Sequence, residues 1–315
     1  MSRPGAGKLH SHLPGWRLKV KICLARSKHD FMNAKSHLKR IAQLLPGDLI
    51  RWVGAAQFRF PFFAPVIRKA GAMLADTEGI IPSGVAKGLR INGRHGFPGY
   101  VLGTTEPEQQ IWLSQNISEG DVVYDIGANV GFFALICAKL SGSSGRVEAF
   151  EPNPACASLC RYNLALNHFG HASVHDLAIS DSSGVIRFEV PKDSTALGHI
   201  ARGDVDMSKD ASLLFEVRTV SLDDYVVQCK LAPPDLILID VEGHELSVLK
   251  GAIETIKMHL PKINCEVHWL GDAFLEYFES ELKPLGYELR TMGHQAIPSH
   301  PERWQAVLVS TRKPV

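Results

Sequence analysis

Two carboxylates stand where a nucleotide site would need them. Asp125 ends an apolar run and is followed by a turn that contains Gly127 and Gly131. Glu151 ends the next apolar run, residues 146–150. Because glycine has no Cβ, the chain can turn sharply there and let a ligand lie against it. A carboxylate at the end of the second strand can accept both hydroxyls of a ribose, so these residues predict a pocket for an adenosine-containing ligand.

The residues within the turn indicate which adenosine ligand fits. A dinucleotide pocket needs a further glycine beside the pyrophosphate, and this chain has Asn129 at that position. Asp125 would repel a pyrophosphate, but it suits a cationic sulfonium that carries an amino acid. The glycine–lysine motif of nucleoside triphosphate sites is also absent. We therefore predict S-adenosylmethionine (SAM) as the cofactor, and a turn that binds nothing is the alternative that these residues leave open.

A second group of residues with catalytic chemistry lies further along the chain. The apolar run of residues 236–239 ends at Asp240, and Glu242 follows it before a glycine turn. Side chains alternate between the two faces of a strand, so Glu266 and His268 are expected to share one face. We predict that these residues handle the group that accepts the methyl.

The residues beside this second group are predicted to be structural. Glu245 falls in the first turn of the next helix, where a carboxylate can cap free backbone N–H groups. His244 is predicted to be a surface residue at the start of that helix. The remaining histidines, among them His175, are predicted to be structural or solvated.

Alternating strands and helices must hold these residues in place. The apolar patterns predict strands near residues 122–126, 146–150, 172–179, 185–190, 235–240, 262–267 and 304–310. They predict helices near residues 106–117, 131–140, 154–168, 244–258 and 272–285. The alternation predicts an α/β fold with a doubly wound, mostly parallel, Rossmann-like sheet. Ligands bind beyond the carboxyl ends of such strands. Four carboxylates are expected together at this edge of the sheet: Asp125, Glu151, Asp240 and Glu266.

The composition is that of a protein with one large α/β core. The chain has 315 residues, of which 45% are hydrophobic and 21% are charged. Its six cysteines form no C-x-x-C pair, and we expect reduced thiols, which favours the cytoplasm. We expect no transmembrane segment and no secretory signal, because no early run is long and apolar enough.

Positive charge is concentrated at the start of the chain. Residues 1–75 contain fourteen Lys and Arg residues and two acidic residues, a net charge of +12 in a chain whose total is +1. Residues 36–45 have the spacing of a short amphipathic helix. We predict a basic, partly helical or disordered extension over residues 1–85 and a SAM-binding domain over residues 86–315. The extension is expected either to be simply solvated or to contact an acidic partner such as an anionic membrane surface.

Several segments follow one another in an order that is typical of one enzyme family. They are residues 122–140, 150–152, 177–184, 220–224, 240–251 and 265–268. The most specific segment has the pattern D-x-E-G-x-E-x-x-x-L-x-G, over residues 240–251. Together these segments resemble the FkbM-type methyltransferase family, over roughly residues 100–270.

The resemblance implies a class I SAM-dependent methyltransferase that methylates hydroxyl groups of sugars, polyketides and related small molecules. It implies that Asp125, Gly127, Asn129 and Gly131 line the methionine end of the cofactor and that Glu151 binds its ribose. The full cofactor-binding set, in which Glu106 helps to close the pocket, is Glu106, Asp125, Gly127, Ala128, Asn129, Gly131, Phe132, Glu151 and Pro152.

One departure from the family alters the expected electrostatics of the acceptor side. Many relatives have lysine two residues before the strand-end aspartate, whereas this chain has Leu238, so a cation is expected to be absent beside Asp240. A base for the acceptor hydroxyl is expected among Asp240, Glu266 and His268. Mg²⁺ held by Asp240, Glu242 and Glu266 is the alternative, although nothing in the sequence requires it.

Two other functions remain open from the residues alone. A nucleic-acid methyltransferase would use the basic extension, but the Asn/Asp-Pro-Pro-aromatic loop that serves exocyclic base amines is absent after Asp240. A nonenzymatic SAM-fold module would also act through the extension, and the intact glycine turn and rim carboxylates argue against it. The residues therefore favour an O-methyltransferase that acts on a small molecule.

Overall fold

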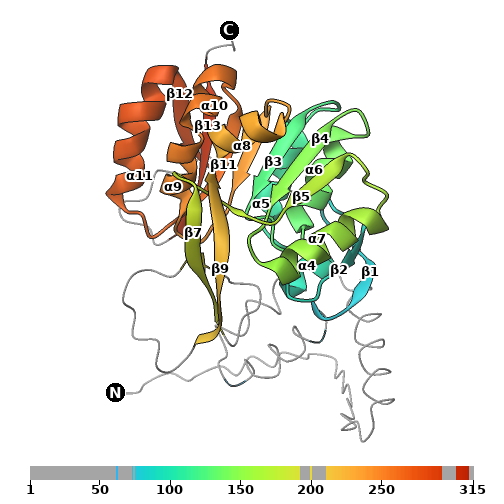
Figure 1. Cartoon of the computed structure of the whole chain (residues 1–315). Helices are drawn as coiled ribbons and strands as arrows, with labels where there is room; N and C mark the ends of the chain where they lie inside the picture. The colour runs from blue at the N-terminus through green and yellow to red at the C-terminus, as the bar shows by residue number, and fades with distance from the viewer. Residues whose placement is uncertain are drawn as a thin grey trace, which may run out of the picture.

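A twisted sheet lies at the centre of the computed structural model, with helices on both of its faces (Figure 1). The structure describes residues 62, 73, 75–191, 199–200, 211–292 and 303–311. The amphipathic helix predicted over residues 36–45 lies outside these residues, as does most of the predicted basic extension.

The central sheet has seven strands among the described residues, in the order β12-β13-β11-β10-β3-β4-β5. Neighbouring strands are parallel except where β13 pairs with β11 and β12. The chain runs outward from β3 to β5 and then returns to β10 on the other side of β3, so the sheet is doubly wound and the predicted fold class is confirmed. The bounds are β3 Val122–Ile126, β4 Arg146–Phe150, β5 Ala172–His175, β10 Leu236–Ile239, β11 Lys262–His268, β12 Tyr287–Thr291 and β13 Arg303–Ser310.

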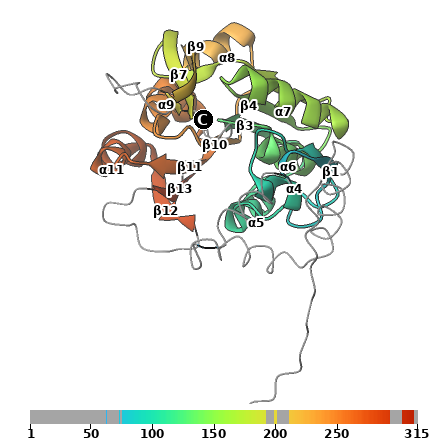
Figure 2. The same ribbon diagram turned by 90° about the horizontal axis from the view of Figure 1, so that it is seen from below.

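Helices cover the sheet in two layers, each with its own buried core. Figure 2 shows α4–α6 on one side of the sheet and α9 and α11 on the other. The first layer is α4 Pro98–Leu102, α5 Pro107–Asn116, α6 Phe132–Ser141 and α7 Pro154–Leu166. The second layer is α8 Leu222–Cys229, α9 Glu245–Gly251, α10 Ile253–His259 and α11 Asp272–Tyr277. Local chemistry sets the helix starts: Asn153 caps α7, and proline occupies the first turns of α5 and α7.

A second, smaller sheet has the order β6-β9-β7-β8. Its strands are β6 Ala178–Ser180, β7 Gly184–Pro191, β8 His199–Ile200 and β9 Ala211–Ser221, and the long β7–β9 pair extends from the body of the molecule (Figure 1). The single strand predicted over residues 172–179 is therefore wrong, because the chain leaves the central sheet after His175 and enters the second sheet at Ala178. Strands β9 and β12 and helix α8 were not predicted.

Two predicted helices are interrupted in the structure. The helix predicted over residues 244–258 is divided into α9 and α10 at Ala252, where the preceding Gly251 lies against the backbone carbonyl of Ser180. The helix predicted over residues 272–285 ends as α11 at Tyr277 and continues as the π-helix Phe278–Leu282 and the 3-10 helix Lys283–Leu285. In both places tertiary packing overrides a continuous helical pattern.

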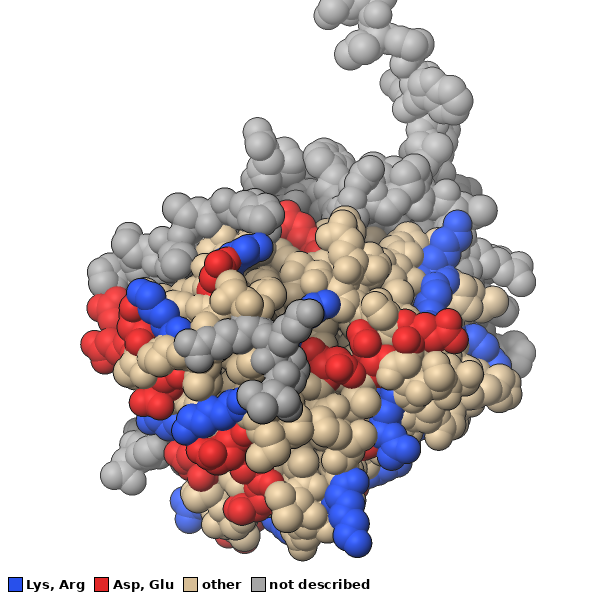
Figure 3. Space-filling model, turned by 90° about the horizontal axis from the view of Figure 1, so that it is seen from above, with Lys and Arg blue, Asp and Glu red and all other residues tan. Residues whose placement is uncertain are grey.

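The described chain before β3 is packed on the domain. The hairpin of β1 Glu78–Ile80 and β2 Arg90–Asn92 contacts α4. Ile81, which follows β1, is fully buried in the first core. Ile81 falls in the range predicted as extension, and the boundary between residues 85 and 86 stays a prediction. Lys and Arg side chains are interspersed with Asp and Glu on the face seen in Figure 3. Among the described residues, no helix has the length and apolar character needed to span a bilayer.

We predict that Gly127→Ala will be strongly destabilising. Gly127 has a φ of +94°, and a Cβ there would overlap the carbonyl oxygen of Asp240. The left-handed backbone alone costs an alanine about 1–2 kcal/mol, and displacing Asp240 adds to that cost. Urea unfolding should show a larger loss for Gly127→Ala than for Gly88→Ala, because Gly88 has a φ of +90° but open space around it. Gly170→Ala, with nothing within 4 Å, should be neutral. Equal losses at Gly127 and Gly88 would show that the contact with Asp240 is not a constraint.

Candidate functional site

A cavity opens at the carboxyl ends of β3, β4 and β10, with an empty volume of about 1030 Å³ including its open mouth. Most of the predicted site residues form its wall: Asp125, Gly127, Ala128, Asn129, Phe132, Glu151, Pro152, Asp240 and Glu242. The lining does not include Gly131, which lies behind the turn, or Glu106, Glu266 and His268, which lie beyond Asp240. Its lining mixes polar and apolar side chains, as the linings of cofactor sites do.

The glycine turn is held in place by the two neighbouring strands. The N–H groups of Gly127 and Ala128 both donate to the carbonyl of Phe150, at 2.9 and 3.1 Å. Asn129 has a φ of +52°, a left-handed conformation that asparagine tolerates, and its Oδ1 accepts from the N–H of Val130 at 2.7 Å. The side of Gly131 that lacks a Cβ faces Cys160 rather than the cavity. Glycine is therefore needed at positions 127 and 131 because the neighbouring protein atoms, Asp240 and Cys160, leave no room for a Cβ.

Glu151 connects the turn after β3 with the loop before α7. Its Oε2 accepts from the N–H of Asn129 at 2.7 Å, and its Oε1 accepts from the N–H of Asn153 at 2.8 Å. Burial raises the pKa of Glu151 to about 7, while the two backbone N–H groups act in the opposite direction. Each carboxylate oxygen keeps a lone pair beyond the bond it already accepts.

Asp125 is buried with an oxygen that makes no hydrogen bond. Its side chain is near the end of β3, and Oδ2 has no hydrogen-bond partner in the described part of the chain. Burial is the largest cause that raises the pKa of Asp125 to about 7, the charge of Glu151 adds to it, and the N–H of Ala134 lowers it. The neighbour of Asp125 on β10 is the buried Leu238, which supplies no charge. A buried carboxylate without a cation fits a cationic ligand.

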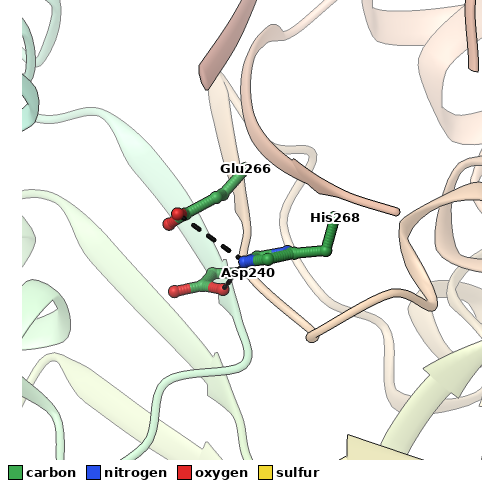
Figure 4. A group of neighbouring side chains, drawn as sticks. All are labelled: Asp240, Glu266 and His268. Carbon is green, nitrogen blue, oxygen red and sulfur yellow. Dashed lines mark ion pairs between the residues drawn. The ribbon is translucent and has the colours of Figure 1, made fainter. Parts of the chain in front are cut away.

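His268 lies at the centre of the acceptor-side carboxylates, as Figure 4 shows for Asp240 and Glu266. Its Nε2 is 3.6 Å from carboxylate oxygens of Glu242 and Glu266 and 4.0 Å from Asp240 Oδ1. Its Nδ1 is 2.7 Å from Glu245 Oε1, so Glu245 sets the orientation of the ring. The carboxylates, Glu245 first, raise the pKa of His268 against the effect of burial. The shared face predicted for Glu266 and His268 is consistent with this contact.

A cation reaches this group from a strand that is distant in the sequence. Arg303 on β13 pairs with Glu266 through Nε and lies 3.4 Å from Glu106 Oε1 through Nη2. Its charge lowers the pKa of Asp240, which burial and the charges of Glu106 and Glu242 raise to about 7. Among the described residues no Lys or Arg pairs with Asp240 itself, and the expectation that a cation is absent beside it stays a prediction. Arg303 acts on the group from β13, which lies beside β11 by antiparallel pairing.

Two residues predicted to be a helix cap and a surface residue lie beside the candidate site residues. Glu245 is fully buried and contacts His268, in addition to accepting from the N–H of Gly243 at 2.9 Å. His244 is half-buried, lines the cavity and lies 2.9 Å from the hydroxyl of Ser180 through Nε2. Their position next to Glu242 in the same short segment was the one sequence feature that could have revealed both roles.

Phe97, Tyr100 and Gln109 complete the cavity wall and were not predicted. Tyr100 stacks on Phe132 with ring centroids 4.8 Å apart, and Phe97 packs against the edge of Tyr100. Gln109 of α5 donates to Asn264 Oδ1 at 2.9 Å, and its own Oε1 is buried without a partner. Phe97, Tyr100 and Gln109 lie in or next to α4 and α5, where Glu106 was the one residue predicted for the site.

The strand order, the glycine turn at β3 and Glu151 at the end of β4 define the class I fold of SAM-dependent methyltransferases. The methyltransferase FkbM domain matches residues 125–290. The chain therefore belongs to the FkbM methyltransferase family.

Three curated relatives are similar to part of the chain. Hexuronic acid methyltransferase AglP of Haloferax volcanii is 32% identical over 160 residues, 49% of this chain and 61% of that protein. The 31-O-demethyl-FK506 methyltransferase FkbM of Streptomyces tacrolimicus is 32% identical over 181 residues, 50% of this chain and 69% of that protein. The 2-O-methyltransferase NoeI of Sinorhizobium fredii is 28% identical and covers 54% of this chain and 75% of that protein. The chain thus spans less than two thirds of AglP.

Among solved structures, the FkbM methyltransferase of Methylobacillus flagellatus is similar to this chain. It has 17% sequence identity and a TM-score of 0.42, and the match covers 67% of this chain and 52% of that one.

We predict that Asp125→Asn will stabilise the ligand-free protein at high pH only. The pKa of Asp125 is raised in the folded state from 3.8 to about 7, so unfolding releases this proton between these values. Ionising Asp125 in the folded protein therefore lowers the free energy of unfolding as pH rises from about 4 to 7. Above pH 7 the whole loss of stability, on the order of a few kcal/mol, is present. Urea unfolding at pH 4 and pH 8 should show a gain for Asp125→Asn only at pH 8. The exposed Glu276→Gln serves as a control, and a gain of the same size at both pH values would contradict the assignment.

Proposed function

We propose that this chain transfers the methyl group of SAM to a hydroxyl of a small molecule of the sugar or polyketide type. The observation that carries the proposal is one cavity whose wall holds Asp125 and Glu151 at one end and Asp240 and Glu242 at the other. An adenosine-containing donor and a hydroxyl acceptor can meet between these two ends.

The cofactor end fits the groups of SAM. Glu151 presents the free lone pairs of both carboxylate oxygens, which suits two ribose hydroxyls. The unpartnered Oδ2 of Asp125 suits the positive charge of the methionine portion. Tyr100 and Phe132 form an apolar wall beside the turn. When bound, SAM supplies an activated methyl group on a sulfonium.

The acceptor end is suited to binding and deprotonating a hydroxyl. Asp240 lies in the cavity wall and can accept the hydroxyl hydrogen bond. Among the described residues His268 Nε2 has no hydrogen-bond partner, and it lies 4.0 Å from Asp240 Oδ1 behind the cavity wall, so it can take up the proton that Asp240 accepts from the hydroxyl. Glu245 stabilises the resulting imidazolium at Nδ1. A general base of this kind contributes about a hundredfold to ten-thousandfold in rate.

The names of the relatives support the choice of a hydroxyl acceptor. They specify a hexuronic acid, the 31-O position of FK506 and a 2-O position. No observation favours the nucleic-acid or nonenzymatic alternatives. The oxygens of Asp240, Glu242 and Glu266 are of the type that Mg²⁺ prefers, but the proposed reaction does not require this ion, because His268 can take the proton.

Substitutions at the two ends of the cavity should have separate effects, one on SAM affinity and the other on turnover. Glu151→Gln should weaken SAM binding by more than tenfold, because a charged hydrogen bond contributes about 1.5–3 kcal/mol. Asp240→Asn, Glu266→Gln and His268→Ala should leave SAM affinity nearly unchanged but lower turnover about a hundredfold to ten-thousandfold. Calorimetry with SAM, and product release with a panel of hexuronic acids and polyketide alcohols, provide the two measurements.

The control is His175→Gln, since His175 also pairs with a buried carboxylate, Glu148 at 2.8 Å, but lies outside the cavity wall. It should retain both binding and turnover. A ligand lacking the ribose 2′-hydroxyl should lose affinity for the wild type and lose little more in Glu151→Gln. Wild-type protein that binds NADH and not SAM would contradict the assignment, as would acceptor-side variants with wild-type turnover.

We further propose that residues 1–75 make a peripheral contact with an acidic surface. Their net charge of +12 supports this, because each basic residue near an anionic membrane adds about 1 kcal/mol. The full chain should sediment with anionic lipid vesicles at low salt, and a chain lacking residues 1–60 should not. The deletion stops before Ala75, which is buried in the domain. Equal sedimentation of both proteins would refute the contact.

A further inference from the structure

The group around His268 carries more negative charge than its protein neighbours neutralise. Four carboxylates lie within 4.0 Å of the ring, those of Asp240, Glu242, Glu245 and Glu266. Among the described residues, Arg303 is the one Lys or Arg that pairs with any of these carboxylates, and it shares its charge with Glu106. Glu245 and Glu266 are buried, and either protonation or a further cation would relieve the repulsion in such a group.

His268 is directed into this group with an unused nitrogen. Its side chain is 1% exposed, and no described residue makes a hydrogen bond with Nε2. The Nδ1 contact with Glu245, which is itself 0% exposed, holds the ring so that Nε2 faces the carboxylates. An imidazole that is oriented through one nitrogen by a buried carboxylate while the other nitrogen is open is the arrangement found at metal-binding histidines.

The spacing of three of these ligand atoms suits one ion. One atom each from Asp240, Glu266 and His268 all lie within 4.8 Å of one another. The separations from His268 Nε2 are 3.6 Å to Glu266 Oε1 and 4.0 Å to Asp240 Oδ1. Metal–ligand bonds of about 2.1 Å in a tetrahedral site place ligand atoms about 3.4 Å apart, so a small inward movement closes the site.

We propose that Asp240, Glu266 and His268 bind a divalent transition-metal ion, with Glu245 as the residue that positions His268. The imidazole nitrogen selects for such an ion over Mg²⁺, which prefers oxygen ligands. Asp240 also lines the cavity, so the open coordination positions face the space assigned to the acceptor. The ion would acidify a bound hydroxyl, and His268 would then act as a ligand rather than as the base. Only this last role depends on the proposed function, and ion binding does not.

Arg303 competes with the proposed ion for Glu266. Its Nε contacts the same Oε1 atom that faces His268, and its side chain is 53% exposed. The guanidinium can therefore move outward when an ion binds. Removing the guanidinium should therefore strengthen ion binding. If Arg303 served only as the counter-ion of the carboxylates, its removal would instead destabilise the group and weaken ion binding.

The test is a titration of chelator-treated full-length protein with Mn²⁺, followed by electron paramagnetic resonance of the free ion. We expect one saturable site per chain, which excess Mg²⁺ displaces poorly. His268→Gln should weaken binding by at least tenfold, and Glu245→Gln by about tenfold to a hundredfold. Arg303→Gln should bind Mn²⁺ more tightly than the wild type. Co²⁺ absorption should show the coordination geometry and should lose its intensity in His268→Gln.

The control is His175→Gln, which removes a histidine that pairs with Glu148 but has no further carboxylate in contact. It should bind Mn²⁺ as the wild type does, and retained SAM binding shows that each variant is folded. Absence of saturable Mn²⁺ binding to the wild type would overturn the proposal. Wild-type affinity in His268→Gln would also overturn it, because it would indicate a carboxylate site of the magnesium type. Methylation that persists in chelator would leave the proposed function intact and would refute only the role of the ion in the reaction.

Discussion

The close approach of Gly127 to the carbonyl of Asp240 is the constraint on which the rest of the site depends. No side chain fits between them, and the N–H of Asp240 also donates to Ile126 at 2.9 Å. This contact joins the turn after β3 to the end of β10, where the strand order of a doubly wound sheet reverses. The cofactor end and the acceptor end of the cavity consequently share one wall.

Buried carboxylates give the site its character and oppose the stability of the fold. Burial raises the pKa values of Asp125, Glu151 and Asp240 to about 7, so each is held in an environment that disfavours its charge. Backbone N–H groups offset part of the cost at Glu151, whereas Oδ2 of Asp125 has no such partner. A buried carboxylate that lacks a partner lowers the stability of the fold, and such groups are expected where a fold has been adapted to bind a ligand.

The cluster of carboxylates around His268 is built from three separate parts of the chain. The chain directly after β10 contributes Asp240, α9 contributes the buried Glu245, and β11 contributes His268 between them. The antiparallel strand β13 then places Arg303 opposite His268 in the pairing register. The result is an imidazole with a fixed orientation, surrounded by carboxylates whose charge one guanidinium offsets only in part.

Local pattern determined much of this protein from the sequence alone. The bounds of β3 and β4, the glycine turn, Asp125 and Glu151 follow from apolar runs and from residues that end them, because strand hydrogen bonding and alternation act over a few residues. Tertiary structure alone decided that Glu245 orients His268, that Arg303 supplies the nearby cation and that His244 lines the cavity. It also divided residues 172–179 between two sheets. These features depend on the register between strands distant in the chain, and on packing between layers, which local periodicity does not encode.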